Sequence, residues 1–295
     1  MNRYDSIVIG AGVSGMTASL YLKRANLNVL LLEREIPGGQ LNKTTEIENY
    51  PGFTKINGTD LALSIYEQIK HQNIDYKYGN VVEITDNGET KIVKTNRDEF
   101  ETKNIILATG RTPRKLGLEN EDKLISHGIS YCAICDGMFF KGKEVAIVGG
   151  GNSAITSALY LSNICSKVYI IDRRDKLRAD TVLQEKLKQK NNIEILFNSK
   201  VTKLNEKDNI LDSIDVNNEK LNIDGLFIYI GFDPDIKYLN SLDIENNNGY
   251  IVVDENMETS IKGIYACGDV IDKQVYQITT AIGEAAIAAT SINHK

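Results

Sequence analysis

Tryptophan is absent from this 295-residue chain, and proline and cysteine occur only 4 times each. So little proline, beside 23 glycines, argues against a disordered or fibrous chain. The cysteines are too few for a secreted protein held together by disulfides. No segment reaches the ~18 uninterrupted apolar residues of a membrane span, so no membrane association is expected. The first residues run into a strand pattern without a secretory signal, and we expect a cytoplasmic protein.

Charge and length narrow the class further. The formal net charge is -6, which argues against nucleic acid as the main partner. At roughly 150 residues per domain, the length suggests about two domains. A chain this long can bury a core that needs neither disulfides nor a metal, and we expect no metal site.

The clearest pattern in the sequence is an internal repeat. The two copies read GAGVSGMTASLYLKRANLNVLLLER from Gly10 and GGGNSAITSALYLSNICSKVYIIDR from Gly149. Each copy follows an apolar strand pattern, at 6–9 and 145–148, and ends in a second one, at 29–32 and 168–171. The segment between the two strand patterns has helical period. The repeat predicts the unit strand, glycine-rich turn, helix, strand twice over.

A glycine-rich turn between a strand and a helix is a phosphate-binding arrangement in this context. Glycines allow a tight turn and close approach of the backbone to a pyrophosphate, and the helix start offers free N–H groups. The candidate glycines are Gly10, Gly12 and Gly15 in the first copy, and Gly149 and Gly151 in the second. Glu33 ends the second strand of the first copy, where a carboxylate can bind ribose hydroxyls. An ordinary tight turn is the alternative for a single motif of this kind.

Further strand patterns lie between the repeats and after them. A hairpin pattern spans 78–100, with a turn at Asp86-Asn87-Gly88, and a later strand ends in Thr109 and Gly110. After the second copy, strand patterns recur at 193–197, 211–216 and 226–230. We therefore predict a β-meander inserted into each half. A small-residue helix at 278–292 follows Gly268 and Asp269 near the end of the chain.

Cys132 and Cys135 form a CxxC pair. Such a pair can be half of a zinc site, a redox disulfide or a chance spacing. A structural zinc site needs about four ligands at recognisable spacing. The remaining candidate ligands are all unpaired: Cys165, Cys267, His71, His127 and His294. A redox dithiol fits the pair better, and Cys165 and Cys267 are predicted to be small buried hydrophobic residues.

The order of these motifs resembles the low-molecular-weight thioredoxin reductases. It runs GxGxxG, Gly38-Gly39-Gln40-Leu41, an Ala-Thr-Gly turn, a CxxC followed by Asp136, a second GxGxxA and a late Gly-Asp. The resemblance covers essentially the whole chain. It implies an α/β fold of two Rossmann-like dinucleotide-binding domains with three-layer ββα architecture, each with an inserted β-meander. It also implies an FAD-binding domain at 1–112 and 236–295, and an NAD(P)H-binding-like domain at 113–235 that carries the CxxC.

The resemblance also implies an activity. The chain would be an FAD-dependent thioredoxin-disulfide reductase, with thioredoxin as its partner and a homodimer as its assembly. Cys135 would face the flavin, Cys132 would attack the partner disulfide, and Asp136 would move the proton; a helix N-cap is the alternative for Asp136. The residues implied to hold FAD are Gly10, Gly12, Gly15, Glu33, Gly39, Gln40, Asn49, Thr109, Gly110, Asp269 and Gln277.

The second copy departs from the family where the electron donor would bind. Members that use NADPH carry His-Arg-Arg-x3-Arg, whereas this chain has Asp172 in place of the histidine, aligned with Glu33. A carboxylate there binds a free ribose 2′-OH and repels a phosphate. Thr156-Ser157 stand where the family often has a glutamate pair, and Tyr276 replaces an arginine before Gln277. The residues implied for NAD(P)H are Gly149, Gly151, Arg173, Arg174 and Arg178.

Two electron donors and two other functions stay open. The three departures slightly favour reduced ferredoxin over NADPH, as in a sister group without a working nucleotide site; the arginines would then be a solvated basic face. A flavin ferredoxin–NADP reductase is a second possible function, although such relatives lack the CxxC. A non-enzymatic redox sensor is a third, and it would show no turnover with a protein disulfide.

Overall fold

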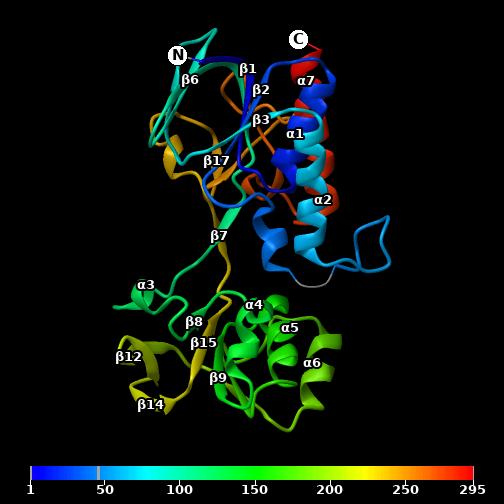
Figure 1. Ribbon diagram of the computed structural model, residues 1–295. Helices are drawn as coiled ribbons and strands as arrows, with labels where there is room; N and C mark the ends of the chain where they lie inside the picture. The colour runs from blue at the N-terminus through cyan, green and yellow to red at the C-terminus, as the bar shows by residue number, and fades with distance from the viewer. Residues whose placement is uncertain (1, 45–46, 295) are drawn as a thin grey trace. The chain divides into compact units, whose positions relative to one another are not determined.

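The computed structural model of the chain describes residues 2–44 and 47–294, with only the backbone described for Lys43 and Cys135. The chain forms two compact units, Met1–Thr112 with Asp233–Lys295, and Pro113–Phe232. The second unit is inserted in the first. The chain leaves through β7 (Arg111–Pro113) and returns through β16 (Phe232–Pro234), and these strands pair as a two-stranded sheet (Figure 1).

The first unit is built on a sheet with the strand order β3, β2, β1, β6, β5, β4, and with β19 beside β6. The strands are β1 (Asn2–Ile9), β2 (Val29–Glu33), β3 (Asp75–Tyr78), β4 (Val81–Asp86), β5 (Lys91–Thr95), β6 (Glu99–Leu107) and β19 (Ile264–Ala266). β1, β2, β3, β6 and β19 pair in parallel. β4, β5 and β6 form an antiparallel meander. The first predicted meander is therefore continuous with the parallel sheet.

Helices and meander cover opposite faces of this parallel sheet. α1 (Val13–Arg24), α2 (Gly58–His71) and α7 (Ile278–Asn293) lie side by side (Figure 1). Val8 and Leu31 point to one face of the sheet and pack in a core that also contains residues of the helices. Ile7 points to the other face and packs in a second core, which contains Val93 of the meander. Strands of such a sheet are apolar on both faces, as β2 shows.

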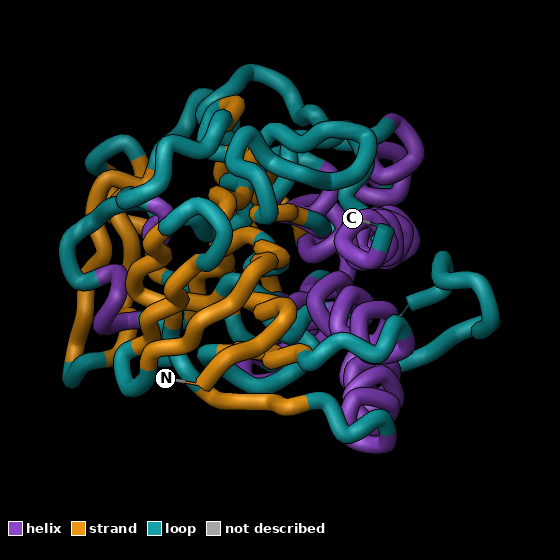
Figure 2. The backbone as a smooth tube through the Cα atoms, turned by 90° about the horizontal axis from the view of Figure 1, so that it is seen from above, coloured by secondary structure: helices purple, strands orange, loops and turns teal. Residues whose placement is uncertain are grey.

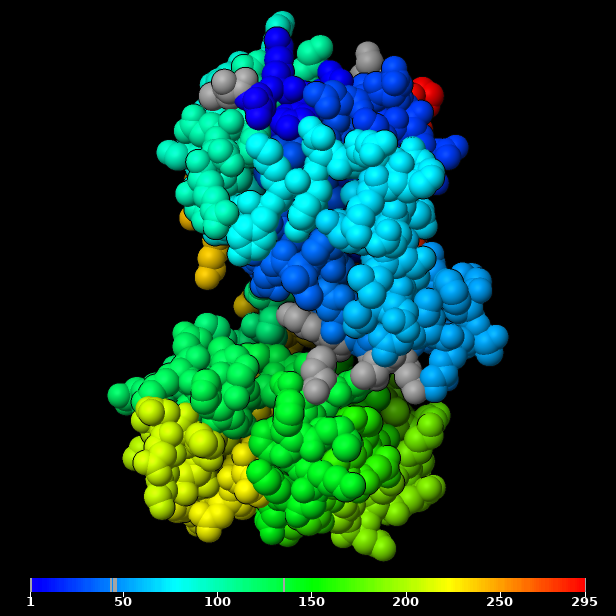
Figure 3. Space-filling view, in the orientation of Figure 1, coloured from blue at the N-terminus to red at the C-terminus, as the bar shows by residue number. Residues whose placement is uncertain are grey.

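Smaller elements complete the first unit. They are η1 (Gly39–Lys43), η3 (Lys237–Leu239), η4 (Gly268–Val270), β17 (Asn246–Asn247) and β18 (Tyr250–Ile251). Figure 2 separates helices from strands by colour, and Figure 3 shows α2 at the surface in blue to cyan. α2 buries only one stripe, including Leu61, Ile65 and Ile69, which explains its amphipathic sequence.

The second unit repeats this plan. Its parallel sheet has the order β11, β10, β9, β15, β8. The strands are β8 (Ile129–Ser130), β9 (Glu144–Val148), β10 (Lys167–Ile171), β11 (Ile193–Leu196) and β15 (Gly225–Ile228). The helices are α3 (Glu121–Leu124), α4 (Ala133–Asp136), η2 (Gly137–Phe140), α5 (Asn152–Leu161) and α6 (Thr181–Lys188). β12 (Val201–Lys207), β13 (Ile210–Val216) and β14 (Glu219–Asn222) form a separate antiparallel sheet.

The structure corrects the extent of the second meander. The pattern at 193–197 was expected in it, but β11 pairs in parallel with β10 and belongs to the main sheet. The pattern at 226–230 likewise forms β15, which lies between β9 and β8 in that sheet. The meander proper uses β12 and β14, whose sequences VTKLNEK and EKLN are too polar to stand out as strands. Among the described residues, no helix has the length and apolar character needed to cross a bilayer.

Candidate functional site

The first glycine-rich loop joins β1 to α1 and cannot carry side chains at two positions. Gly10 has φ +102°, and a Cβ there would overlap the carbonyl oxygen of Ala108. A Cβ on Gly15 would overlap the carbonyl oxygen of Gly10. Gly12 faces open space and is the N-cap of α1, with no side-chain cap. The loop therefore leaves backbone N–H groups and a positive helix end free for an anion.

Glu33 holds its carboxylate beside this loop. Its Oε2 accepts a hydrogen bond from the Ala11 N–H at 2.7 Å. Its Oε1 accepts from the N–H groups of Arg34 and Glu35, each at 2.8 Å. Three backbone donors fix the orientation of the carboxylate, and its remaining lone pairs can accept from ribose hydroxyls. Glu33 is thus fixed beside the loop, and its binding of ribose hydroxyls stays a prediction.

Several residues implied for the flavin lie near each other in pairs. A Cβ on Gly39 would be 3.3 Å from Cα of Gly12, so η1 begins against the glycine-rich loop. Gln40 Nε2 donates to the carbonyl of Arg111 at 3.1 Å. Asn49 Nδ2 donates to Oε1 of Gln277 at 3.0 Å. The two hydrogen bonds bring together segments that are more than 70 residues apart in the chain.

Thr109 and Gly110 end the turn after β6 in a tightly bonded arrangement. Thr109 Oγ1 donates to the carbonyl of Asp235 at 2.9 Å and lies 3.0 Å from the hydroxyl of Tyr238. Burial raises the pKa of Tyr238, against a lowering by the Thr109 hydrogen bond. The hydroxyl therefore stays protonated at neutral pH. Gly110 has φ +66° and a Cβ would meet nothing, so this backbone is open on one side.

Asp269 belongs to a chain of alternating charges that sequence analysis missed. Its Oδ2 lies 3.1 Å from Nε of Arg111, and its Oδ1 lies 3.9 Å from Nζ of Lys273. Lys273 Nζ is also 2.8 Å from Oε2 of Glu284, which accepts from the Gly268 N–H at 2.9 Å. Arg111 also lies over the ring of Tyr276, 4.4 Å from its centroid. No local motif signals these long-range partners.

Gln277 is the N-cap of α7, as the sequence predicted for the start of that helix. Its side chain accepts from the backbone of the third helical residue, and Thr280 accepts from the Gln277 N–H at 3.2 Å. Such a capping box stabilises the helix start. The positive end of α7 is therefore held beside Asn49 by the 3.0 Å bond to Gln277.

The second glycine-rich loop joins β9 to α5 in the same way. Gly149 has φ +131°, and a Cβ there would overlap the carbonyl oxygen of Tyr229. Gly151 is the N-cap of α5 and has no side-chain cap. Asp172, at the end of β10, is buried, and a Cβ on Gly150 would overlap its Oδ2. The loop thus keeps the geometry of a phosphate cradle.

Three arginines lie in the segment after Asp172. Arg173 and Arg178 are exposed and Arg174 is half-buried. Within the part of the chain that the structure describes, none of the three forms an ion pair. A Cβ on Gly151 would lie 3.9 Å from a guanidinium nitrogen of Arg178. Positive charge therefore stands beside the start of α5.

The CxxC segment forms the short helix α4. Cys132 is disulfide-bonded, while the side chain of Cys135 lies outside the described residues. Ser130 Oγ donates to Oδ2 of Asp136 at 2.6 Å and accepts from the Cys132 N–H at 3.0 Å. Asp136 precedes η2 but makes no side-chain cap there. Its carboxylate is thus held by Ser130 rather than used as a helix cap.

Tyr229 ties α4 to the second glycine-rich loop. Its hydroxyl accepts from the N–H of Ala133 at 2.8 Å, and its carbonyl borders Gly149. Burial raises the pKa of Tyr229, so its hydroxyl stays protonated. Cys165 and Cys267 are free and buried, as predicted. Burial raises the pKa of Cys165 to about 11 and that of Cys267 to about 12.

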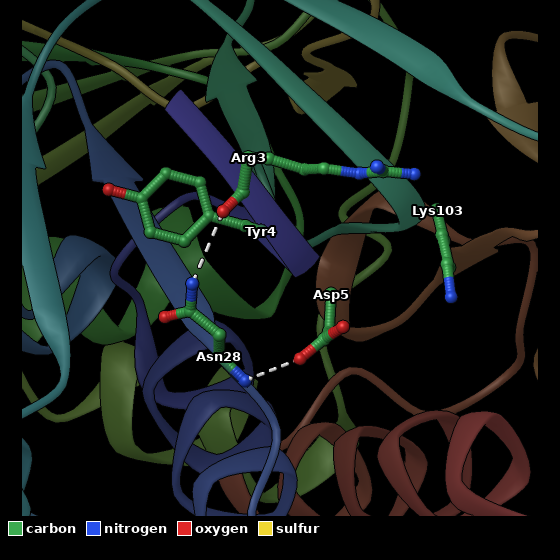
Figure 4. Close-up of a pocket in the computed structure, with 5 residues that line it drawn as sticks. All are labelled: Arg3, Tyr4, Asp5, Asn28 and Lys103. Carbon is green, nitrogen blue, oxygen red and sulfur yellow. Dashed lines mark hydrogen bonds between the residues drawn. The ribbon is translucent and has the colours of Figure 1, made fainter. Parts of the chain in front are cut away.

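A surface hollow of about 300 Å³ lies at the N-terminal end of β1 (Figure 4). Its lining residues are Arg3, Tyr4, Asp5, Asn28 and Lys103. The N–H of Asn28 donates to Oδ2 of Asp5 at 2.8 Å, and Asn28 Nδ2 donates to the Arg3 carbonyl at 3.2 Å. The hollow therefore lies at the opposite end of β1 from Gly10 and contains none of the predicted site residues.

Comparison with known proteins extends over the whole chain. The family model described as pyridine nucleotide-disulphide oxidoreductase matches residues 4–285. The chain is 43% identical to a thioredoxin reductase of Bacillus subtilis, over 99% of this chain and 94% of that protein. The structure of Lactococcus lactis thioredoxin reductase matches with a TM-score of 0.90 at 41% identity, over 98% of this chain and 97% of that one.

A further solved structure bears on the electron donor. A ferredoxin-flavin thioredoxin reductase from Clostridium acetobutylicum matches with a TM-score of 0.57 at 30% identity, over 100% of this chain and 98% of that one. Relatives of both kinds therefore share this fold. The predicted α/β fold with two Rossmann-like domains is confirmed.

Proposed function

Because the chain belongs to the pyridine nucleotide-disulphide oxidoreductase family, and within it to the low-molecular-weight thioredoxin reductases, we propose that it is an FAD-dependent thioredoxin-disulfide reductase. One observation carries the proposal. Cys132 is disulfide-bonded directly before α4, and in the sequence it lies between the two glycine-rich loops. A disulfide beside a nucleotide-binding fold is the arrangement that a dithiol relay needs.

The first unit offers the features that FAD requires. The free N–H groups at the start of α1 suit the pyrophosphate, and Glu33 suits the adenosine ribose. The residues we assign along the flavin and its ribityl chain are Gly39, Gln40, Asn49, Thr109, Gly110, Asp269 and Gln277. When bound, FAD would accept two electrons and pass them to the disulfide. The unit formed by Met1–Thr112 and Asp233–Lys295 is thus the proposed FAD domain.

The chain's own groups would carry the thiol chemistry. Two electrons and two protons convert the disulfide of Cys132 into two thiols. The Cys132 thiolate then attacks the disulfide of the partner, forming a mixed disulfide and releasing one partner thiol. The Cys135 thiolate attacks Cys132 in turn, restoring the internal disulfide and releasing the second partner thiol. Asp136, held by Ser130 at 2.6 Å, would supply and accept the protons.

A protein substrate fits the surface next to α4. Met138 and Phe139 follow Asp136 closely, and they are 58% and 76% exposed. Exposed apolar side chains next to a reactive group are typical of a docking surface for another protein. They support thioredoxin as the partner. The homodimer remains a proposal that light scattering would test, and the cytoplasmic location remains a prediction.

For the electron donor, the proposal retains reduced ferredoxin and a pyridine nucleotide. The three sequence departures support ferredoxin. The cradle formed by Gly149 and Gly151, with three arginines that form no ion pair among the described residues, supports a nucleotide. Anaerobic mixing with NADPH, NADH and reduced ferredoxin in turn, while following the flavin absorbance, distinguishes the donors.

The cysteines provide the decisive test of the activity. Cys132→Ser and Cys135→Ser should each leave a reducible flavin and abolish the reduction of thioredoxin. Cys165→Ser is the matched control, since this thiol is free and buried, and should keep full turnover. If either CxxC variant reduces thioredoxin at the wild-type rate, the relay is not the mechanism. A redox sensor would show no turnover even in the wild type, and a ferredoxin–NADP reductase would be indifferent to both variants.

A further inference from the structure

Asp172 is a buried carboxylate with an unused oxygen. The residue directly follows β10 and is 3% exposed. Its Oδ1 accepts a hydrogen bond from the Arg174 N–H at 3.1 Å. Its Oδ2 has no hydrogen-bond partner among the described residues. A buried carboxylate oxygen without a donor is costly, and a hydroxyl group of a bound ligand that donated to this oxygen would offset that cost.

The free oxygen lies against the second glycine-rich loop. A Cβ on Gly150 would overlap Oδ2 of Asp172, so only glycine leaves room for the carboxylate. The carbonyl of Gly150 accepts from the N–H groups of Arg178 at 2.8 Å and Ala179 at 3.1 Å. The segment after Asp172 thus folds back onto the loop. The carboxylate is fixed where a dinucleotide bound to the start of α5 would place its adenosine ribose.

The first copy of the repeat has a carboxylate, that of Glu33, at the same position as Asp172. Glu33 occupies the matching position, and its Oε2 accepts from the N–H of Ala11 in the first loop. In the second copy the acid is one methylene shorter and the loop residue is Gly150 instead of Ala11. The shorter acid and the smaller loop residue compensate each other. Both copies therefore keep a carboxylate beside the loop, at the position where it can accept hydrogen bonds from the two hydroxyl groups of a ribose.

Resting on the proposed nucleotide site of the second unit, we propose that Asp172 makes this site selective for a pyridine nucleotide without a 2′-phosphate, so that NADH is the nucleotide donor. A ribose 2′-OH can donate to the carboxylate, whereas a 2′-phosphate brings negative charge against it. Asp180 adds a second carboxylate at the start of α5, where it accepts from Asn152 Nδ2 at 2.9 Å. Arg178, beside Gly151, is placed to meet the pyrophosphate.

Two probes that differ only in the 2′-phosphate test this selectivity without turnover. Calorimetry on the FAD-loaded full chain would compare ADP-ribose with 2′-phospho-ADP-ribose. We expect the wild type to bind ADP-ribose at least about tenfold more tightly. Asp172→Asn should reduce this preference about tenfold or more, because the repulsion of the phosphate is removed. Asp172→Glu, which copies Glu33, should keep the preference.

Asp175→Asn is the matched control, since it removes an acid from the same segment at an exposed position and should leave the preference unchanged. Hydrogen-exchange protection of peptides from the second unit shows that each variant is folded where the substitution lies. A wild type that prefers the phosphorylated probe overturns the proposal, as does an Asp172→Asn variant with unchanged preference. Binding of neither probe also overturns it; if reduced ferredoxin then drives thioredoxin reduction, the disulfide reductase assignment stands without it. If no donor drives the reduction of thioredoxin, the proposed function is refuted. The calorimetry would still test the role of Asp172 in nucleotide selectivity.

Discussion

Tyr229→Phe removes a single oxygen that anchors the CxxC helix. The Tyr229 hydroxyl accepts from the N–H of Ala133 at 2.8 Å, and Ala133 is fully buried. Phenylalanine keeps the ring and its packing but leaves this N–H without its acceptor. An unsatisfied buried donor costs about 1–3 kcal/mol. We therefore expect α4 to open about 5- to 150-fold more often, since each 1.4 kcal/mol is a factor of ten.

Hydrogen exchange followed by mass spectrometry measures this opening directly. The peptide that covers 130–137 should lose protection, while peptides from the first unit should not change. Tyr169→Phe is the control, because its hydroxyl lies in the same unit and donates to Glu144 Oε2 at 3.1 Å, away from α4. The reasoning is refuted if Tyr229→Phe leaves the protection of 130–137 at the wild-type level, or if Tyr169→Phe lowers it equally.

Three further outcomes are expected. Gly12→Ala should keep the free energy of unfolding within about 0.5 kcal/mol, since a Cβ there meets nothing. The same variant should weaken FAD binding in a titration, because the methyl group would stand at the proposed pyrophosphate position; unchanged affinity would count against the cradle. Asp86→Asn should cost about 1–3 kcal/mol in denaturant unfolding, since it removes the negative charge that lies 3.4 Å from the buried Lys91 ammonium; no change would mean that the charge pair adds nothing. Iodoacetamide at pH 8 should label neither Cys165 nor Cys267 in the native protein, because their raised pKa values, about 11 and about 12, keep the thiolate fraction very small below them; rapid labelling detected by mass spectrometry would contradict their burial.

The parts of the fold that sequence predicted are those specified by neighbouring residues. The strands, glycine-rich turns and helices of both copies occur where the repeat placed them, because apolar period and turn chemistry are local signals. The start of the last helix at Gln277 was likewise predicted, and it forms a capping box. β12 and β14 were missed because most of their side chains are exposed to solvent. Their sequences therefore contain few apolar residues, and the strand pattern is weak.

The site could be predicted as a set of motifs, but not as a set of contacts. The charge chain through Arg111, Lys273 and Glu284 depends on segments that meet only when β19 pairs with β6. The bond from Ala133 to Tyr229 spans 96 positions. Neither leaves a spacing pattern in the sequence, because long-range partners are set by the register of the sheets.

The insertion of one unit within the other sets an order for biosynthesis. Pro113–Phe232 is continuous in the chain, so the ribosome makes everything that this unit needs before it makes residues 233–295. The first unit cannot finish folding at that stage, because β19 and α7, which complete its sheet and helical layer, lie in residues 233–295. Domains generally fold as units during synthesis. The inserted unit can therefore become native while strands β1 to β6 still lack their C-terminal partners, and a nascent chain stalled once Phe232 has left the exit tunnel should already protect the second unit from protease.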